Sequence, residues 1–207
     1  MNDEPIRDAM RTIARPVRVE IEKIRGSRFI CDLAPVGDDA SALAFVGEIR
    51  SIEPGATHHC WAYRLSSGSA RSSDDREPGG TAGPPILHRL ESAGLLDVVA
   101  VVTRYYGGTN LGTGGLIRAY GSAAASAIEA ARIITRRRMV TFWLSHPYEL
   151  SGAVERVLAA SDADVVASRY EGSVTLEVRV PASGAEAFPS TIREATAGTV
   201  VARLIEP

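Results

Sequence analysis

The residues best suited to chemistry stand in a glycine-rich segment near the middle of the chain. Five glycines fall within residues 105–115: Gly107, Gly108, Gly112, Gly114 and Gly115. Glycines beside a helix start allow a ligand to approach backbone N–H groups, which carry partial positive charge. The segment is therefore a candidate site for a phosphate group, although tight turns and close packing would explain the glycines equally well.

Arginine and tyrosine side chains flank these glycines. Arg104 precedes them, and Arg118 follows in the first turns of the next helix, where guanidinium groups would contact a phosphate through charge-assisted hydrogen bonds. Tyr105 and Tyr106 offer ring faces for base stacking. The Lys-Ser/Thr pair of a P-loop does not follow the glycines, so hydrolysis of nucleoside triphosphates is not supported. The predicted ligand-binding set is Arg104, Tyr105, the five glycines, Arg118 and Thr81.

A second group combines three acidic side chains with a histidine: Asp74, Asp75, Glu77 and His58. Carboxylates on one loop suit Mg²⁺, and paired carboxylates can divide acid and base roles by splitting their pKa values. Acidic residues before Pro78 also commonly cap turns or pair with arginines such as Arg71 and Arg104. These four residues are the candidates for catalysis, whereas no metal site and no cofactor is predicted.

The residues around His58 form a short run that is typical of a strand. His58 and His59 would then point to opposite faces, so a two-histidine metal clamp is not expected. Cys60 shares the face of His58 and is expected to be a buried, inert thiol. Because Cys31 is the only other cysteine, no disulfide framework is predicted.

The composition is that of an ordinary globular protein. Its 207 residues suit two domains of about 100 residues each. No run of about 20 apolar residues and no charged segment followed by an apolar one occurs, so a cytoplasmic location without membrane contact is expected. The net charge of −2 provides no global attraction for nucleic acid, so any such site must be a local basic patch.

The pattern of apolar residues predicts an α+β chain with an N-terminal tail over residues 1–16 and a first domain over residues 17–135. Strands are expected over residues 17–24, 28–36, 58–65 and 98–103. Helices are expected after Asp38 or Asp39, over residues 85–93, and over residues 116–133. The polar residues 66–83 are expected to form a loop.

Three consecutive arginines at residues 136–138 mark the predicted boundary to a second domain over residues 139–207. Its expected order is strand, helix, strand, strand, helix, strand, which is the ferredoxin-like βαββαβ pattern. The clearest element is the strict alternation of Val174, Leu176, Val178 and Val180. Pro189 weakens the second helix of this domain unless it falls in the first turn.

Three segments together resemble the IMPACT/YigZ family. They are ATHHCWAYR at residues 56–64, SDDREPGGTAG at residues 73–83 and VVTRYYGGTNLGTGGLIRAY at residues 101–120. The series begins with residues 19–24 and 27–30, and the βαββαβ pattern is similar to the small domain appended in bacterial members. The resemblance therefore covers most of the chain.

The resemblance implies a first domain like the second domain of ribosomal protein S5 and a second domain like the C-terminal modules of elongation factor G. It also implies a role near translation, with RNA or a ribosome-associated factor as the partner. Eukaryotic relatives regulate translation through a partner in the stress-kinase pathway. They do so with an additional partner-binding domain, which is not expected in this chain, so that mechanism is not transferred here.

One residue departs from the family pattern. The family usually has glycine between the second aspartate and the glutamate of its acidic motif, where this chain has Arg76. If the backbone there has a positive φ, Arg76 costs roughly 1 kcal/mol of strain.

The leading functional prediction is a binding module in which the acidic loop and the glycine segment form one pocket for RNA or another anion, with a role in the regulation of translation. The alternative is a hydrolase or transferase that uses the acidic loop on a phosphorylated or nucleotide substrate. A third possibility is an adaptor with a protein partner and no small ligand. The sequence does not indicate the oligomeric state.

Overall fold

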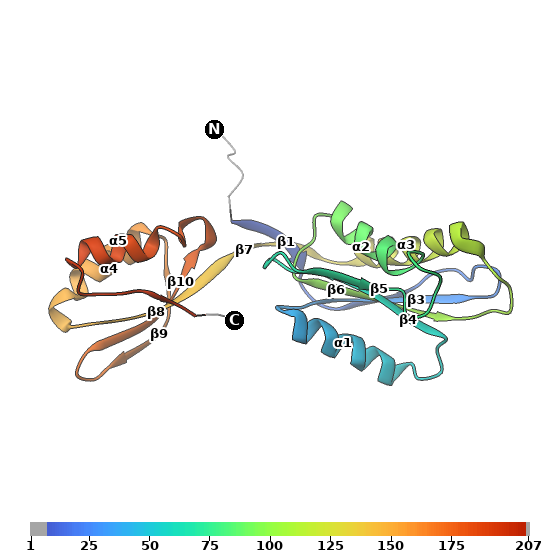
Figure 1. Cartoon of the computed structure of the whole chain (residues 1–207), viewed down its shortest axis with the longest axis horizontal. Coiled ribbons are helices and arrows are strands. Elements are labelled where there is room, and N and C mark those ends of the chain that lie inside the picture. Colours follow the sequence, from blue (N-terminus) through green and yellow to red (C-terminus); the bar gives the residue numbers. More distant parts are fainter. Residues whose placement is uncertain (1–7, 206–207) are drawn as a thin grey trace, which may run out of the picture. The chain divides into compact units, whose positions relative to one another are not determined.

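The computed structural model describes residues 8–205, which divide into two compact α+β units (Figure 1). The first unit spans Met10–Thr135, and the second comprises the residues from Arg136 onward together with Asp8 and Ala9. Within residues 8–205, no helix is both long and apolar enough to cross a membrane.

The first unit is built on a five-stranded antiparallel sheet in the order β2-β3-β6-β4-β5. The strands are β2 (Val17–Glu20), β3 (Arg28–Pro35), β4 (His58–Arg64), β5 (Ala70–Ser73) and β6 (Val98–Tyr105). The central strand, β6, is buried over most of its length, as its continuous β-branched sequence predicts. The four-residue strand β5 lies in the segment that we expected to be a loop.

Helices cover both faces of this sheet (Figure 1). Helix α1 (Asp39–Ile52) lies on one face, where its buried residues pack with Trp61 and Tyr63. Its first turn is closed by a capping box, because the Asp38 carboxylate accepts the Ser41 N–H at 2.6 Å and Ser41 returns a contact to the Asp38 backbone. Helices α2 (Gly83–Ser92) and α3 (Gly112–Ala130) lie on the other face.

A two-stranded sheet pairs β1 (Ala9–Ile13) with β7 (Ile133–Arg137). Neither strand was expected, because residues 1–16 were interpreted as a tail and α3 was predicted to continue to residue 133. Residues 1–7 lie outside the described part of the chain. The β1 sequence is only five residues long, and its partner strand begins 120 residues after β1 ends, so no local pattern predicts the pairing.

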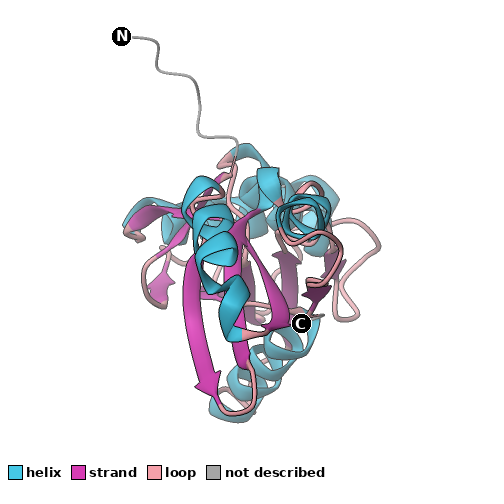
Figure 2. Ribbon diagram, turned by 90° about the vertical axis from the view of Figure 1, so that its left-hand side faces the viewer, coloured by secondary structure: helices cyan, strands magenta, loops and turns pink. Residues whose placement is uncertain are grey.

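The second unit has the predicted βαββαβ order. Its elements are β8 (Met139–His146), α4 (Ser151–Ala160), β9 (Asp164–Tyr170), β10 (Val174–Pro181), α5 (Phe188–Ala195) and β11 (Arg203–Leu204), with short 3₁₀ turns at Tyr148–Leu150 and Ala182–Gly184. The sheet order is β11-β8-β10-β9, and the helices pack against one face of it (Figures 1 and 2). The alternating β10 residues are buried in the core as predicted, and Pro189 falls in the first turn of α5.

Asp8, which we had placed in a tail, is a buried part of the second unit. Its carboxylate accepts the Ser183 N–H at 2.5 Å and the Ser183 hydroxyl at 2.7 Å, and its backbone carbonyl accepts the Arg138 N–H at 2.8 Å. We expect Asp8→Ala to lower the free energy of unfolding of this unit by about 1–2 kcal/mol, because it leaves the amide at Ser183 without its cap. Urea unfolding in a Trp61→Phe background, in which Trp143 alone reports on the second unit, measures the effect. Glu171→Ala, an exposed substitution, should change the stability by less than about 0.5 kcal/mol.

Candidate functional site

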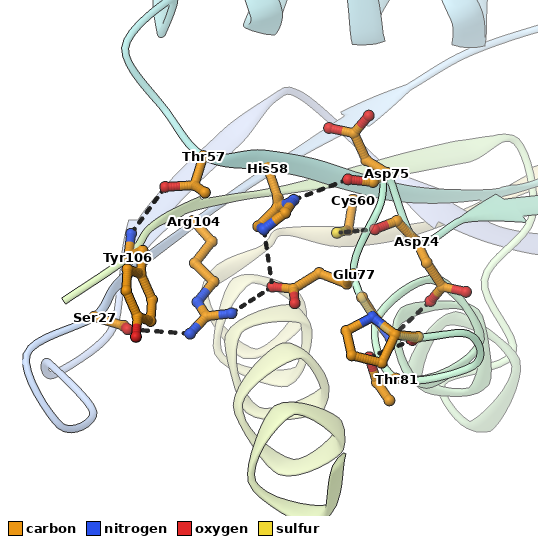
Figure 3. Close-up of polar contacts among 12 residues, drawn as sticks. Ser27, Thr57, His58, Cys60, Asp74, Asp75, Glu77, Thr81, Arg104 and Tyr106 are labelled. Atoms are coloured by element: carbon orange, nitrogen blue, oxygen red, sulfur yellow. Dashed lines mark hydrogen bonds and ion pairs between the residues drawn. The ribbon is translucent and has the colours of Figure 1, made fainter. Parts of the chain in front are cut away.

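The first unit holds a buried carboxylate, that of Glu77, which contacts Arg104 and His58 (Figure 3) and also Tyr120. Oε1 of Glu77 accepts hydrogen bonds from Arg104 Nη1 at 2.6 Å and from the Tyr120 hydroxyl at 2.7 Å, and His58 Nε2 lies 3.8 Å away. The cross-strand register explains this grouping, because Arg104 of β6 stands opposite His58 of β4. Burial raises the pKa of Tyr120, so its hydroxyl stays protonated and can donate.

Arg104 is directed into this interior and away from the surface. Its side chain is only 5% exposed, and its Nη2 donates to the Ser27 hydroxyl at 3.3 Å. The guanidinium lies between the rings of Phe29 and Tyr106, 5.5 and 5.4 Å from their centroids. We predicted that Arg104 contacts a bound phosphate, and the structure corrects this prediction. The guanidinium is already paired with Glu77 and is covered by Tyr106.

The acidic loop uses its aspartates to hold its own backbone. Asp74 accepts the N–H groups of Ala82 and Gly83 at 2.9 Å each and of Gly80 at 2.8 Å. Although burial acts in the opposite direction, these three hydrogen bonds lower the pKa of Asp74. Asp75 accepts the His59 N–H at 2.7 Å and pairs with Arg50 at 3.1 Å.

The acidic side chains of this loop therefore cap its own backbone and pair with arginines. Among the described residues, no three His, Cys, Asp or Glu side chains come together as a metal-binding group.

The residues of β4 behave as their alternation predicts. His58 places Nδ1 2.9 Å from the Asp75 carbonyl oxygen, whereas His59, on the other face, places Nε2 3.1 Å from the Glu53 carbonyl. Cys60 donates to the Asp74 carbonyl at 3.0 Å, and burial raises its pKa to about 12. Its thiol is protonated at neutral pH and is not a nucleophile.

Arg76 occupies a left-handed backbone conformation, with φ of +70°. We expect Arg76→Gly to raise the free energy of unfolding by about 1 kcal/mol, because glycine adopts this conformation without the Cβ clash. Arg76→Ala is the matched control, since it removes the same guanidinium but keeps the Cβ. Thermal unfolding should therefore show a higher Tm for the glycine variant alone, and an equal rise for both variants would contradict the explanation by strain.

Backbone geometry explains three of the five glycines in the glycine segment. A Cβ at Gly107 would lie 2.0 Å from the carbonyl carbon of Gly26, so the two chain segments touch through their backbones. Gly108 and Gly112 have φ of +84° and +70°. Gly114 and Gly115 have no positive φ. Gly114 lies in the first turn of α3, where N–H groups have no intrahelical partner, and Gly115 follows it.

An open pocket of the first unit lies beside α3. It has a volume of about 280 Å³ and is lined by Ile24, Arg25, Leu111, Gly115, Arg118, Ala119 and Ser122. Arg25 and Arg118 are exposed, and Nη1 of Arg118 lies 3.5 Å from the position that a Cβ of Gly114 would take. Arg25 was not among the predicted residues. The only signal for it was a basic residue next to the Gly26 turn.

Other predicted residues lie outside this pocket. Thr81 is buried and donates to the Pro78 carbonyl at 2.6 Å, and the hydroxyl of Tyr105 donates to Glu53. Tyr106 is 47% exposed, with one ring face toward Arg104. The acidic loop and β6 do meet, but through the buried Glu77 and Arg104, and no residue of the acidic loop lines the pocket.

The structure is that of a two-unit α+β protein with a pocket beside α3 that is lined by two arginines. Residues 25–128 match the Impact N-terminal domain, and residues 144–199 match a domain of unknown function (DUF1949). The chain belongs to the IMPACT family.

Similar proteins cover almost the whole chain. The IMPACT family member YigZ of Escherichia coli (strain K12) is 36% identical over 197 residues, which is 93% of this chain and 96% of that protein. The IMPACT family member YvyE of Bacillus subtilis (strain 168) is 37% identical over 177 residues, or 84% of this chain and 82% of that protein. A crystal structure of a hypothetical protein superimposes with a TM-score of 0.70 at 34% identity, covering 96% of this chain and 98% of that one.

Proposed function

We propose that this protein binds RNA through the pocket beside α3 and acts in the regulation of translation. The observation that carries the proposal is the pocket itself, where the guanidinium groups of Arg25 and Arg118 flank an accessible recess. In a chain of net charge −2, nucleic-acid binding depends on local basic groups, and these two arginines supply such groups at the pocket.

The start of α3 adds to this local positive potential. Leu111 occupies the N-cap position, and its side chain cannot accept a hydrogen bond. The N–H groups of the first turn therefore keep their partial positive charge without a side-chain cap. The Arg118 side chain folds back over Gly114 toward the same turn. A phosphate oxygen at this position would receive both charge and amide donors.

The family resemblance supports finer assignments within the proposal. We assign residues 17–135 to a domain like the second domain of ribosomal protein S5. We assign residues 139–207 to a ferredoxin-like domain similar to the C-terminal modules of elongation factor G. The sheet order β11-β8-β10-β9 with its helices against one face supports the second assignment. Both relationships connect the chain with RNA and the ribosome, in the cytoplasm.

The proposal is tested by removing both pocket guanidiniums. We expect Arg25→Ala/Arg118→Ala to weaken binding of a labelled single-stranded RNA at least about tenfold in fluorescence anisotropy. The slope of log K against log salt concentration should become less steep by roughly 1.4, because two of the positive charges that neutralise the RNA are lost. Arg132→Ala, an exposed arginine after the far end of α3, is the matched control. Equal affinity and equal slope for the double variant and the control would refute the site.

The alternative function, a hydrolase or transferase on a phosphorylated or nucleotide substrate, has one observation in its favour. His58 is partly exposed, and its Nε2 lies beside the Glu77 carboxylate. Asp74 and Asp75 are occupied by backbone and arginine contacts, which argues against their acting as acid and base. Turnover of a phosphorylated substrate, with or without Mg²⁺, that is abolished by His58→Gln or Asp75→Ala would favour the enzyme.

A further inference from the structure

We infer that the pocket beside α3 takes a single nucleotide unit with a terminal phosphate monoester, supplied either by the 5′-phosphorylated end of an RNA strand or by a free nucleoside monophosphate. This inference rests on the proposed function, because it specifies which part of an RNA the pocket receives. Charge, size and the lining of the pocket each contribute to it.

The charge of the pocket favours a terminal phosphate over an internal one. Two guanidinium groups line it, and none of its seven lining residues is acidic. The Nη1 of Arg25 is 3.5 Å from the Asn110 carbonyl and has no carboxylate partner among the described residues. A phosphate monoester carries a charge of about −1.5 to −2 at pH 7, whereas an internal phosphodiester carries only one negative charge. Two cations therefore match the monoester.

The size of the pocket limits its occupant to one unit. Its volume of about 280 Å³ lies just below the usual range of ligand pockets, which is about 300 to 1,000 Å³. A recess of this size has room for one phosphorylated nucleoside and not for stacked bases. An internal segment of a strand would also have to leave the pocket on both sides, whereas a strand end leaves on one.

The walls are suited to a sugar or base without selecting among bases. Ile24, Leu111 and Ala119 supply apolar surface, and Ser122 contributes one hydroxyl. No aromatic ring lines the pocket, so stacking does not discriminate bases there. Affinity should therefore depend on the phosphate and vary little with base identity.

The test compares one oligoribonucleotide with a 5′-phosphate or a 5′-hydroxyl, with adenosine monophosphate as competitor. At pH 7.5 we expect the 5′-phosphorylated strand to bind about tenfold more tightly. The difference in affinity between the two strands should become smaller at pH 5, because the phosphate monoester takes up a proton with a pKa near 6. Arg25→Ala and Arg118→Ala should each reduce the difference. Ser122→Leu should abolish it by filling the exposed side of the pocket while keeping both arginines.

The outcomes separate this inference from the proposed function. Equal binding of both strands, dependent on Arg25 and Arg118 and unaffected by adenosine monophosphate, overturns the terminal phosphate and leaves the RNA site standing. Binding of adenosine monophosphate without a preference for the 5′-phosphorylated strand supports the pocket chemistry and identifies the free nucleotide as the source. The absence of binding by all three ligands overturns both.

Discussion

Glu77→Ala is expected to lower the free energy of unfolding of the first unit by about 3–5 kcal/mol. The side chains of Glu77 and Arg104 are only 4% and 5% exposed, and they are joined at 2.6 Å. Removing the carboxylate would leave a guanidinium without a counter-ion inside the unit, where desolvation of an unpaired charge is costly. The Tyr120 hydroxyl would lose its acceptor as well.

The measurement is urea unfolding in a Trp143→Phe background, in which Trp61 alone reports on the first unit. Glu91→Ala, at an exposed position of α2, should change the stability by less than about 0.5 kcal/mol. Glu77→Leu combined with Arg104→Met should recover much of the loss, because two apolar side chains replace two charges. A loss below about 1 kcal/mol for Glu77→Ala would show that the pair does not stabilise the fold.

The same pair shows why the site was only partly predictable from the sequence. Arg104 precedes the glycine segment, and an arginine at this position is a residue type that commonly binds phosphate. Its burial depends on β6 lying between β3 and β4, which places Phe29 and His58 on either side of it. The register between strands far apart in the chain is set by the whole sheet, and a local pattern does not contain it.

The second unit was more predictable because its signals are local. The alternation in β10 requires a strand with one buried face, whatever its neighbours are. In the first unit, the Asp38 cap of α1 was predictable for the same reason, because it depends on residues within one turn. By contrast, Arg25 belongs to the pocket only because the turn that carries it contacts the loop at Asn110, 85 residues later.

Gly107→Ala is expected to lower the free energy of unfolding of the first unit by about 3 kcal/mol or more. The added Cβ would lie 2.0 Å from the carbonyl carbon of Gly26 and 2.2 Å from the amide nitrogen of Ser27. Both atoms belong to the backbone, so a rotamer change cannot relieve the clash, and the turn at Gly26 has to move.

Alanine substitutions at two other glycines, Gly108 and Gly114, serve as controls that distinguish this clash from other effects of adding a methyl group. Gly108 has φ of +84° and open space around it, so Gly108→Ala should cost only about 1–2 kcal/mol through backbone strain. Gly114 lies in α3 with an ordinary φ, and alanine favours a helix, so Gly114→Ala should leave stability unchanged or raise it slightly. Unfolding curves of the three variants should therefore rank Gly107, Gly108 and Gly114 in order of decreasing loss.

The turn that Gly107→Ala displaces also carries Arg25, so the fold and the proposed site are coupled at this position. We expect Gly107→Ala to weaken RNA binding even at temperatures where the protein stays folded, because Arg25 would no longer face Arg118 across the pocket. Gly108→Ala, which leaves the Gly26 contact in place, should keep its RNA affinity within about twofold. If both variants retain full affinity while folded, the contact between Gly26 and Gly107 stabilises the unit without positioning Arg25 for binding.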